Sequence, residues 1–236
     1  MREPNGLFPL AARLAAVGLL AVVAASACGP SRYKVRIPDP PQLDLVPYGQ
    51  IGLVEFTIEK AKGSLQEFAT RRFAEEVLSA QHGIEVQELG PADSVLKRVG
   101  LSALGPAAAQ ALGGQRGTPV VFFGHLTVSN VKPRVSLLGL TLPSFQADVS
   151  AELVVELLST KTGGTLWRSS ATAQEQVGQL ALLGGIPYFS AEKPNDAYGQ
   201  LVNRLVGAVT RDLWPGYHYE WRTGSVDPAS GPPRGQ

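Results

Sequence analysis

The chain has 236 residues, and its 21 lysines and arginines nearly balance its 20 aspartates and glutamates, which leaves a formal net charge of +1. Charged residues make up only 17% of the chain, so the composition gives no indication of nucleic-acid binding. With one cysteine no disulfide can form within the chain, and a hydrophobic fraction of 44% predicts that a packed core provides the stability.

The first 27 residues have the pattern of a secretory signal. An apolar run at 14–27 follows Arg2 and Arg13, and the three residues before Cys28 are all small. The run is shorter than the roughly 20 apolar residues of an ordinary transmembrane helix. A cysteine at this position resembles the bacterial lipobox, in which the thiol receives a diacylglycerol and the new amino terminus is acylated. We expect residues 1–27 to be removed and Cys28 to carry the lipid; the alternative is an ordinary signal followed by an unrelated cysteine.

Two segments outside the expected domain are predicted to lack a core. Residues 28–47 contain five prolines and a basic cluster of Arg32, Lys34 and Arg36, which predicts an extended spacer between lipid and domain. The cluster could lie near anionic lipid headgroups, but we expect a solvated linker. Residues 222–236 are rich in Gly, Pro and Ser and are predicted to be disordered.

The expected domain begins with a β-α-β pattern. A β-rich run at 51–57 is predicted to form the first strand. Ser64, followed three residues later by Glu67, predicts a helix that begins with a capping box and closes at Gly83. Residues 84–89 begin with apolar and polar side chains in alternation, which predicts the second strand. The apolar stripe of the helix is expected to contain Leu65, Phe68, Ala69, Phe73, Val77 and Leu78.

Two short helices and a long strand follow. Helices are predicted at 93–99 and at 106–112, and the second is expected to end at Gly113 and Gly114. The run at 119–131 is apolar on both faces in its first half, which indicates a central strand.

An antiparallel section and a final helix complete the pattern. Residues 145–158 alternate, residues 165–177 return after a tight Thr-Gly-Gly turn, and both are predicted to be strands. Apolar residues recur at helical spacing over 196–213, which is the strongest helix signal in the chain. The order β-α-β-α-β-β-β-α predicts an α/β fold over 48–221, with a single five-stranded mixed sheet and helices packed on it.

Three stretches of this pattern resemble a known group of envelope lipoproteins. They are IGLVEFT at 51–57, AAAQALGGQRGTPVVFFGHLT at 107–127, and STKTGGTLW at 159–167, where Ser159 stands in place of the usual acidic residue. The resemblance covers roughly 48–215. The group contains the curli-secretion lipoprotein, the amino-terminal domain of the Tol-system β-propeller protein and the lipoprotein activator of penicillin-binding proteins. It implies a non-enzymatic role, in which a lipid-anchored protein assembles with, activates or forms part of a larger machine.

The sequence contains no recognised catalytic or ligand-binding motif. His82, His125 and His218 lie far apart, so no compact set of metal ligands is predicted. The glycine-rich segment at 113–117 lacks the spacing of a phosphate-binding loop. We therefore predict that the protein is not an enzyme and has no metal or cofactor. The aromatic segment at 214–221 allows two interpretations, a sugar or peptide site or, as we expect, a cap over the sheet edge.

Two apolar segments are the predicted contact sites. Residues 134–144 connect the third and fourth strands, and residues 178–190 connect the fifth strand and the last helix, so both are expected at the same end of the sheet. An exposed apolar patch marks a partner or membrane contact, although neither segment is long enough to cross a membrane and return. Three interpretations stay open: side chains that close the core, a protein partner, or membrane insertion. The candidate contact residues are Leu137, Leu138, Leu140, Leu142, Leu182, Leu183, Ile186, Tyr188 and Phe189.

These observations predict a lipid-anchored bacterial envelope protein that acts as an assembly, secretion-accessory or regulatory module. It is expected on the periplasmic face of a membrane, and Gly29 after the cysteine favours the outer membrane. The expected partners are the membrane, through the amino-terminal lipid, and either an envelope protein or a second copy of the chain. The alternatives are a subunit of an oligomeric export pore and an enzyme that acts on cell-wall material.

Overall fold

The computed structural model describes residues 32–134, 146–178, 180–183 and 185–223. The chain divides into two compact units. The larger unit, Pro40–Gly216, is called the body below, and the described ends of the chain on either side of it form a second unit, called the ribbon. Cys28, the predicted signal and residues 224–236 lie outside the described residues.

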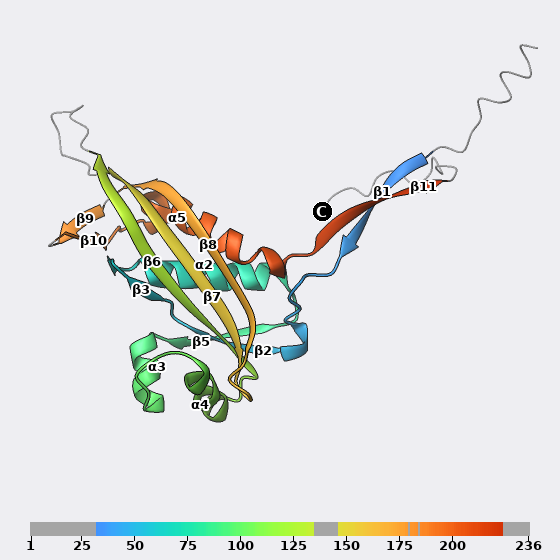
Figure 1. The fold of residues 1–236 in the computed structure, drawn as a ribbon, viewed down its shortest axis with the longest axis horizontal. Coiled ribbons are helices and arrows are strands. Elements are labelled where there is room, and N and C mark those ends of the chain that lie inside the picture. Colours follow the sequence, from blue (N-terminus) through green and yellow to red (C-terminus); the bar gives the residue numbers. More distant parts are fainter. Residues whose placement is uncertain (1–31, 135–145, 179, 184, 224–236) are drawn as a thin grey trace, which may run out of the picture. The chain divides into compact units, whose positions relative to one another are not determined.

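A six-stranded mixed sheet forms the centre of the body (Figure 1). Five strands lie in the order β5-β2-β6-β7-β8, and the short β3 also pairs with β6. β2 is parallel to both β5 and β6, whereas β7 is antiparallel to both β6 and β8. The strands are Gln50–Val54 (β2), Thr57–Glu59 (β3), Glu85–Gly90 (β5), Val120–Arg134 (β6), Gln146–Ser159 (β7) and Thr165–Val177 (β8).

The predicted mixed α/β fold is confirmed, but the predicted single sheet of five strands and the predicted element order are wrong. The run at 51–57 is divided into β2 and β3, because the N–H of buried Phe56 donates to Thr70 Oγ1 (2.9 Å) instead of to a neighbouring strand. A separate three-stranded sheet also forms, in the order β4-β10-β9. Its strands are Lys62–Gly63 (β4), Leu180–Leu183 (β9) and Ile186–Phe189 (β10). β10 pairs with β9, its neighbour in the chain, and with the distant β4, and strands this short give little local signal of their own.

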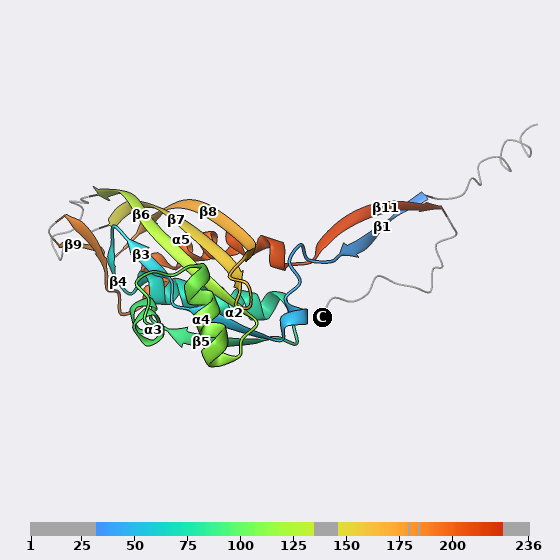
Figure 2. The same cartoon turned by 60° about the horizontal axis from the view of Figure 1, so that its bottom comes forward.

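Helices cover the two faces of the main sheet unequally (Figures 1 and 2). α2 (Leu65–Ala80) and α5 (Pro194–Val209) pack on one face over the larger core. α3 (Ala92–Val99) and α4 (Pro106–Arg116) pack on the opposite face at one end, around a smaller core that includes Val121 and Phe123. Among the described residues, no helix covers the rest of that opposite face. None of the described helices is both long and apolar enough to cross a membrane.

The predicted capping box at the start of α2 is wrong. The helix begins directly after Ser64, but the side chain of Ser64 makes no capping hydrogen bond. Its hydroxyl lies 3.0 Å from the hydroxyl of Tyr198, and its backbone N–H donates to the carbonyl of Phe189 at 2.9 Å. Leu78 is 45% exposed, whereas the other five residues of the predicted apolar stripe are buried. Tertiary contacts to α5 and β10 have therefore replaced the local cap.

α4 continues through the two glycines at which its end was predicted. A Cβ added to Gly113 would overlap the side chain of Thr160, whereas one added to Gly114 would meet nothing within 4 Å. The side chain of Thr160 is held in place, because its Oγ1 donates to the carbonyl of Thr118 at 2.6 Å. Gly113 therefore allows α4 to pack against the turn between β7 and β8.

The two glycines give a matched pair of predictions. Gly114→Ala should raise the free energy of unfolding by up to about 1 kcal/mol, because alanine favours a helix interior. Gly113→Ala should lower it by about 1–3 kcal/mol, because the added methyl group overpacks the contact with Thr160. Urea unfolding followed by circular dichroism measures both changes, and equal effects of the two substitutions would contradict this packing.

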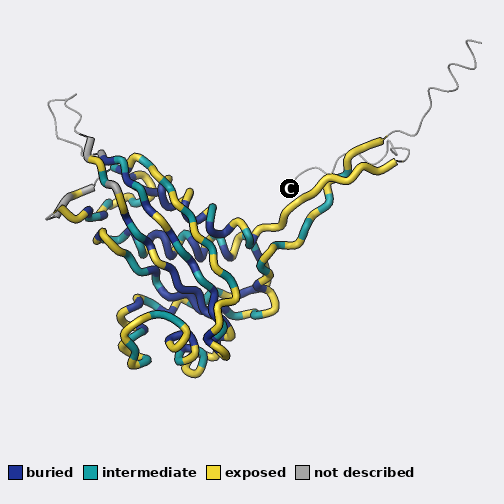
Figure 3. Tube along the Cα trace, in the orientation of Figure 1, coloured by how far each residue is buried: buried dark blue, intermediate teal, exposed yellow. Residues whose placement is uncertain are grey.

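The ribbon is a two-stranded sheet of β1 (Arg32–Asp39) and β11 (Gly216–Thr223). β1 lies within the segment predicted to be a spacer. β11 contains most of the aromatic segment at 214–221 and pairs with β1. None of the ribbon's residues is buried, and every residue of β11 is exposed (Figure 3). The ribbon therefore has no core of its own.

Candidate functional site

The uncovered part of the main sheet, called the open face below, is lined by alternate residues of β6, β7 and β8. Successive side chains of a strand point to opposite faces, so the residues between the core residues of each strand line the open face. Most of these side chains carry hydroxyl, amide or other polar groups, which gives the surface hydrogen-bonding capacity along its length. The rows across the three strands are His125, Val154 and Ser170; Thr127, Glu152 and Thr172; and Ser129, Ser150 and Gln174.

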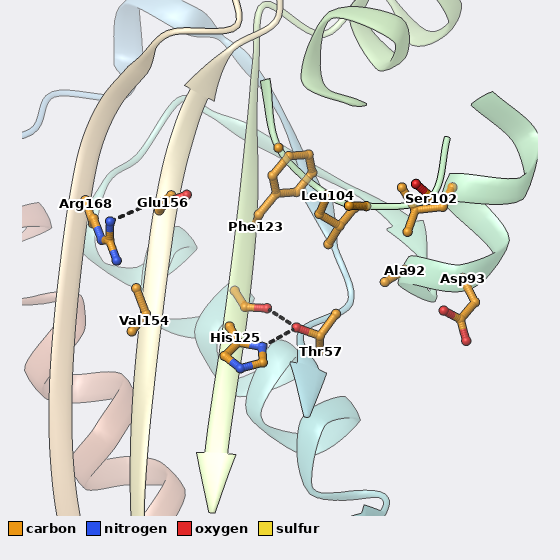
Figure 4. Close-up of a pocket in the computed structure, with 14 residues that line it drawn as sticks. Thr57, Ala92, Asp93, Ser102, Leu104, Phe123, His125, Val154, Glu156 and Arg168 are labelled. Carbon is orange, nitrogen blue, oxygen red and sulfur yellow. Dashed lines mark hydrogen bonds and ion pairs between the residues drawn. The ribbon is translucent and has the colours of Figure 1, made fainter. Parts of the chain in front are cut away.

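Two depressions hollow the open face. The first has a volume of about 470 Å³ and lies where the segment after α3 meets β3 and β6–β8 (Figure 4). Its lining includes His125, Glu156 and Arg168, and the Arg168 guanidinium lies 3.2 Å from the Glu156 carboxylate. The second, of about 270 Å³, includes Glu152 and Thr172 in its lining. The open face is therefore polar and also contains two concave regions that could receive side chains of a partner.

A threonine, a histidine and a glutamate form a hydrogen-bonded row beside the first depression. His125 Nδ1 lies 2.7 Å from Thr57 Oγ1, and His125 Nε2 lies 3.4 Å from Glu59 Oε2 (Figure 4 shows the first contact). Such a row can relay a proton. However, Thr57 Oγ1 also donates to the carbonyl of Gly124 at 3.3 Å, and Thr57 and His125 are direct register partners. We therefore interpret the row as a tie between β3 and β6.

Carboxylates gather around another cavity, of about 150 Å³, on the body. Its lining includes Glu55, Glu67, Glu88 and Arg71. Burial raises the pKa of Glu55, and the charge of Glu67 raises this pKa further. Glu55 is therefore easier to protonate in the folded protein than in the unfolded chain. Within the part of the chain that the structure describes, no group of three or more His, Cys, Asp or Glu side chains could hold a metal ion.

The predicted apolar contact residues are only partly described. Residues 178–190, which were predicted to be a loop, instead contain the hairpin of β9 and β10. On β9, Leu182 pairs with Pro187 and Leu183 pairs with Ile186. Four of the predicted residues lie outside the described part of the chain: Leu137, Leu138, Leu140 and Leu142.

The three predicted residues on β10 have different surroundings. Phe189 is 1% exposed and packs edge-on against Tyr198, with ring centroids 5.5 Å apart. Tyr188 is half-buried, and Ile186 is 39% exposed. Phe189 therefore belongs to the core and not to an exposed patch, as the core-closing interpretation requires for that residue.

His218 lies in a small hydrogen-bonded cluster on the ribbon. Its Nδ1 lies 2.8 Å from Asp39 Oδ1, and its Nε2 lies 3.4 Å from Glu220 Oε1. The hydrogen bond to Asp39 raises the pKa of His218 most strongly, and the hydrogen bond to Glu220 adds to this rise. The protonated imidazole donates to both carboxylates, so the paired ribbon favours the cation.

We expect the pKa of His218, measured from its imidazole chemical shifts by NMR, to exceed 6.5 in the folded protein. The contribution of this cluster to ribbon pairing should be fully present below pH 6.5, the value of the unpaired group, and should be lost as the pH rises through the raised pKa. Asp39→Asn should lower the pKa more than Glu220→Gln does. A pKa of 6.5 or below would contradict the pairing of His218 with Asp39.

The described elements place the protein in the mixed α/β class. No protein-family model and no curated protein matches its sequence. Solved structures with partial similarity include the PelC dodecamer from Paraburkholderia phytofirmans, at 12% identity over 78% of this chain and 98% of that chain, with a TM-score of 0.43. A lipoprotein from Neisseria meningitidis matches at 21% identity over 56% and 84% of the two chains, with a TM-score of 0.36. The carboxy-terminal domain of LpoB from Salmonella enterica matches at 19% identity over 57% and 89%, with a TM-score of 0.37.

Proposed function

We propose that the protein is a lipid-anchored envelope protein that acts as a non-enzymatic assembly or regulatory module and binds a protein partner through the open face. The signal pattern at 1–27 and the cysteine that follows it support the anchor. Gly29 favours the periplasmic face of the outer membrane. The resemblance of residues 48–215 to the envelope-lipoprotein group supports the same role.

The observation that carries the binding role is the length and polarity of the open face. β6, β7 and β8 have 15, 14 and 13 residues, and hydroxyl and amide side chains lie along them. β8 forms one edge of the sheet. An edge strand can pair with a strand of another chain through its backbone, and side chains of the adjoining face then provide specificity. A long polar face beside an edge therefore suits a protein segment.

The anchor can be tested at Cys28. Cys28→Ala should move the protein from the salt-washed membrane fraction to the soluble fraction, because the acyl chains provide the stable attachment. Immunoblots of the separated fractions measure the change. Ser31→Ala leaves the thiol in place and should remain with the membrane. Unchanged membrane association of Cys28→Ala would count against the anchor.

The binding face can be tested by site-specific photo-crosslinking in the native envelope. A photoreactive amino acid at Thr172, which is exposed on the open face, should give a discrete crosslinked product. The same group at Ser79, which is exposed on α2 over the other face, should not give that product. Mass spectrometry of the product distinguishes an envelope protein from a second copy of the chain. No product at Thr172, or the same product from both positions, would overturn the proposed face.

A further inference from the structure

The two faces of the ribbon differ in charge and in aromatic content. Lys34 Nζ lies 5.0 Å from the ring centroid of Trp221, and the Arg36 guanidinium lies 3.5 Å from that of Tyr217. These contacts, with the alternation of side chains along a strand, assign three cations and three aromatic rings to one face. This face is called the basic face below and consists of Arg32, Lys34, Arg36, Tyr217, Tyr219 and Trp221.

The acidic residues of the ribbon lie on the other face. Asp39 and Glu220 both contact His218 there. The basic face therefore carries three positive charges and no negative charge within the described strands, although the whole chain is almost neutral. This separation gives the face a strong attraction for anionic surfaces.

The basic face is also unusually exposed for its aromatic content. Tyr217 is 50% exposed, and Tyr219 and Trp221 are each 64% exposed. A two-stranded ribbon without a core is marginally stable in water by itself. Burial of these rings in an apolar environment would stabilise the ribbon, because it would remove a large apolar area from contact with water.

The position of the ribbon in the chain indicates which apolar environment could bury these rings. β1 begins at Arg32, four residues after Cys28. At about 3.3 Å per residue, an extended connection keeps the start of β1 within roughly 13 Å of an acylated cysteine. Tyr and Trp concentrate at the interface of a bilayer, and Lys and Arg are attracted to anionic headgroups. The composition of the basic face and its short distance from the expected lipid therefore both favour contact with a bilayer.

We propose that the basic face lies in the headgroup layer of an anionic bilayer and forms a second membrane contact beside the lipid on Cys28. The aromatic rings enter the boundary between headgroups and acyl chains, and Lys34 and Arg36 lie at the phosphates. This inference rests on the proposed lipid anchor. With this contact, the protein is attached to the membrane at two points, the lipid on Cys28 and the basic face of the ribbon.

The single cysteine makes a direct test possible, because acylation removes the natural thiol. Tyr219→Cys and Glu220→Cys each introduce one free thiol, on opposite faces of β11. The acylated proteins, labelled with the environment-sensitive fluorophore NBD, are reconstituted in phosphatidylcholine vesicles with and without phosphatidylglycerol. We expect the label at position 219 to become several-fold brighter in the anionic vesicles and to be quenched by brominated lipids. The label at position 220 should remain in water.

A charge-reversal variant separates headgroup attraction from the lipid anchor. Lys34→Glu with Arg36→Glu should abolish the change at position 219 while the protein still floats with the vesicles. A bound protein whose label at 219 stays as water-exposed as the label at 220 would overturn the ribbon contact alone. If the brightness of the label at position 219 rises with the density of protein on the vesicle and does not depend on headgroup charge, the face contacts a second copy of the chain. This result would also overturn the proposal. Loss of vesicle binding altogether would overturn the anchor as well.

Discussion

Replacing Phe73 with alanine should lower the free energy of unfolding by about 3–5 kcal/mol, the range for deletion of a buried aromatic side chain. Phe73 lies on α2 and is 0% exposed. Its ring centroid lies 5.3 Å from that of Phe56 and 5.1 Å from that of Phe122. The substitution therefore removes the ring contacts of α2 with Phe56 and with Phe122 on β6, and it leaves a cavity in the larger core. Urea unfolding of the purified protein, followed by circular dichroism, measures the loss.

Leu78→Ala is the matched control for this prediction. Leu78 lies on the same helix, but its side chain is 45% exposed, so little buried area is lost on truncation. Its effect should stay within about 0.5 kcal/mol, as for other surface substitutions. Similar losses for Phe73→Ala and Leu78→Ala would show that α2 does not pack on the sheet through the predicted face.

Gln81→Leu should lower the free energy of unfolding by about 3 kcal/mol or more. Gln81 is 6% exposed, and its side-chain amide holds three backbone groups. Its Oε1 accepts from the Leu45 N–H at 2.6 Å, and its Nε2 donates to the carbonyls of Leu43 and Leu213 at 2.5 and 3.1 Å. Leucine makes none of these bonds, and each buried group left unpaired costs about 1–3 kcal/mol.

Gln200→Leu controls for the change in side-chain chemistry, because Gln200 is exposed on α5. It should change the free energy of unfolding by less than about 0.5 kcal/mol. If Gln81→Leu is as stable as the original protein, Gln81 does not hold Leu43–Leu45 and Leu213 together.

The main secondary structure could be predicted because its signals are local. Alternation over 145–158 and the return after the Thr-Gly-Gly turn predicted β7 and β8 to within one residue. The helical spacing over 196–213 predicted α5, although the helix begins at Pro194 and ends at Val209. The hairpin of β9 and β10 could not be predicted in the same way. Tyr188 on β10 pairs with Lys62, which is more than a hundred residues away in the sequence. The apolar sequence of this segment is also compatible with a loop whose side chains close the core.

The candidate sites differ in how much the sequence reveals. Cys28 follows from a pattern of adjacent residues and needs no tertiary contact. The open face is encoded by the polar alternate positions of β8, but its exposure depends on where α3 and α4 pack. The basic face could not be predicted, because its cations lie on β1 and its rings lie on β11, and in the sequence the residues of the body lie between these two strands. From the sequence alone, the basic cluster at 32–36 was predicted to belong to a solvated linker.

Mass spectrometry of the intact protein, purified from its native envelope, tests most directly whether this body is held to a membrane by lipid. The predicted result is a chain that starts at Cys28 and carries a diacylglycerol on sulfur and an acyl group on the amino terminus. A chain that retains residues 1–27, or one with an unmodified Cys28 thiol, would contradict it.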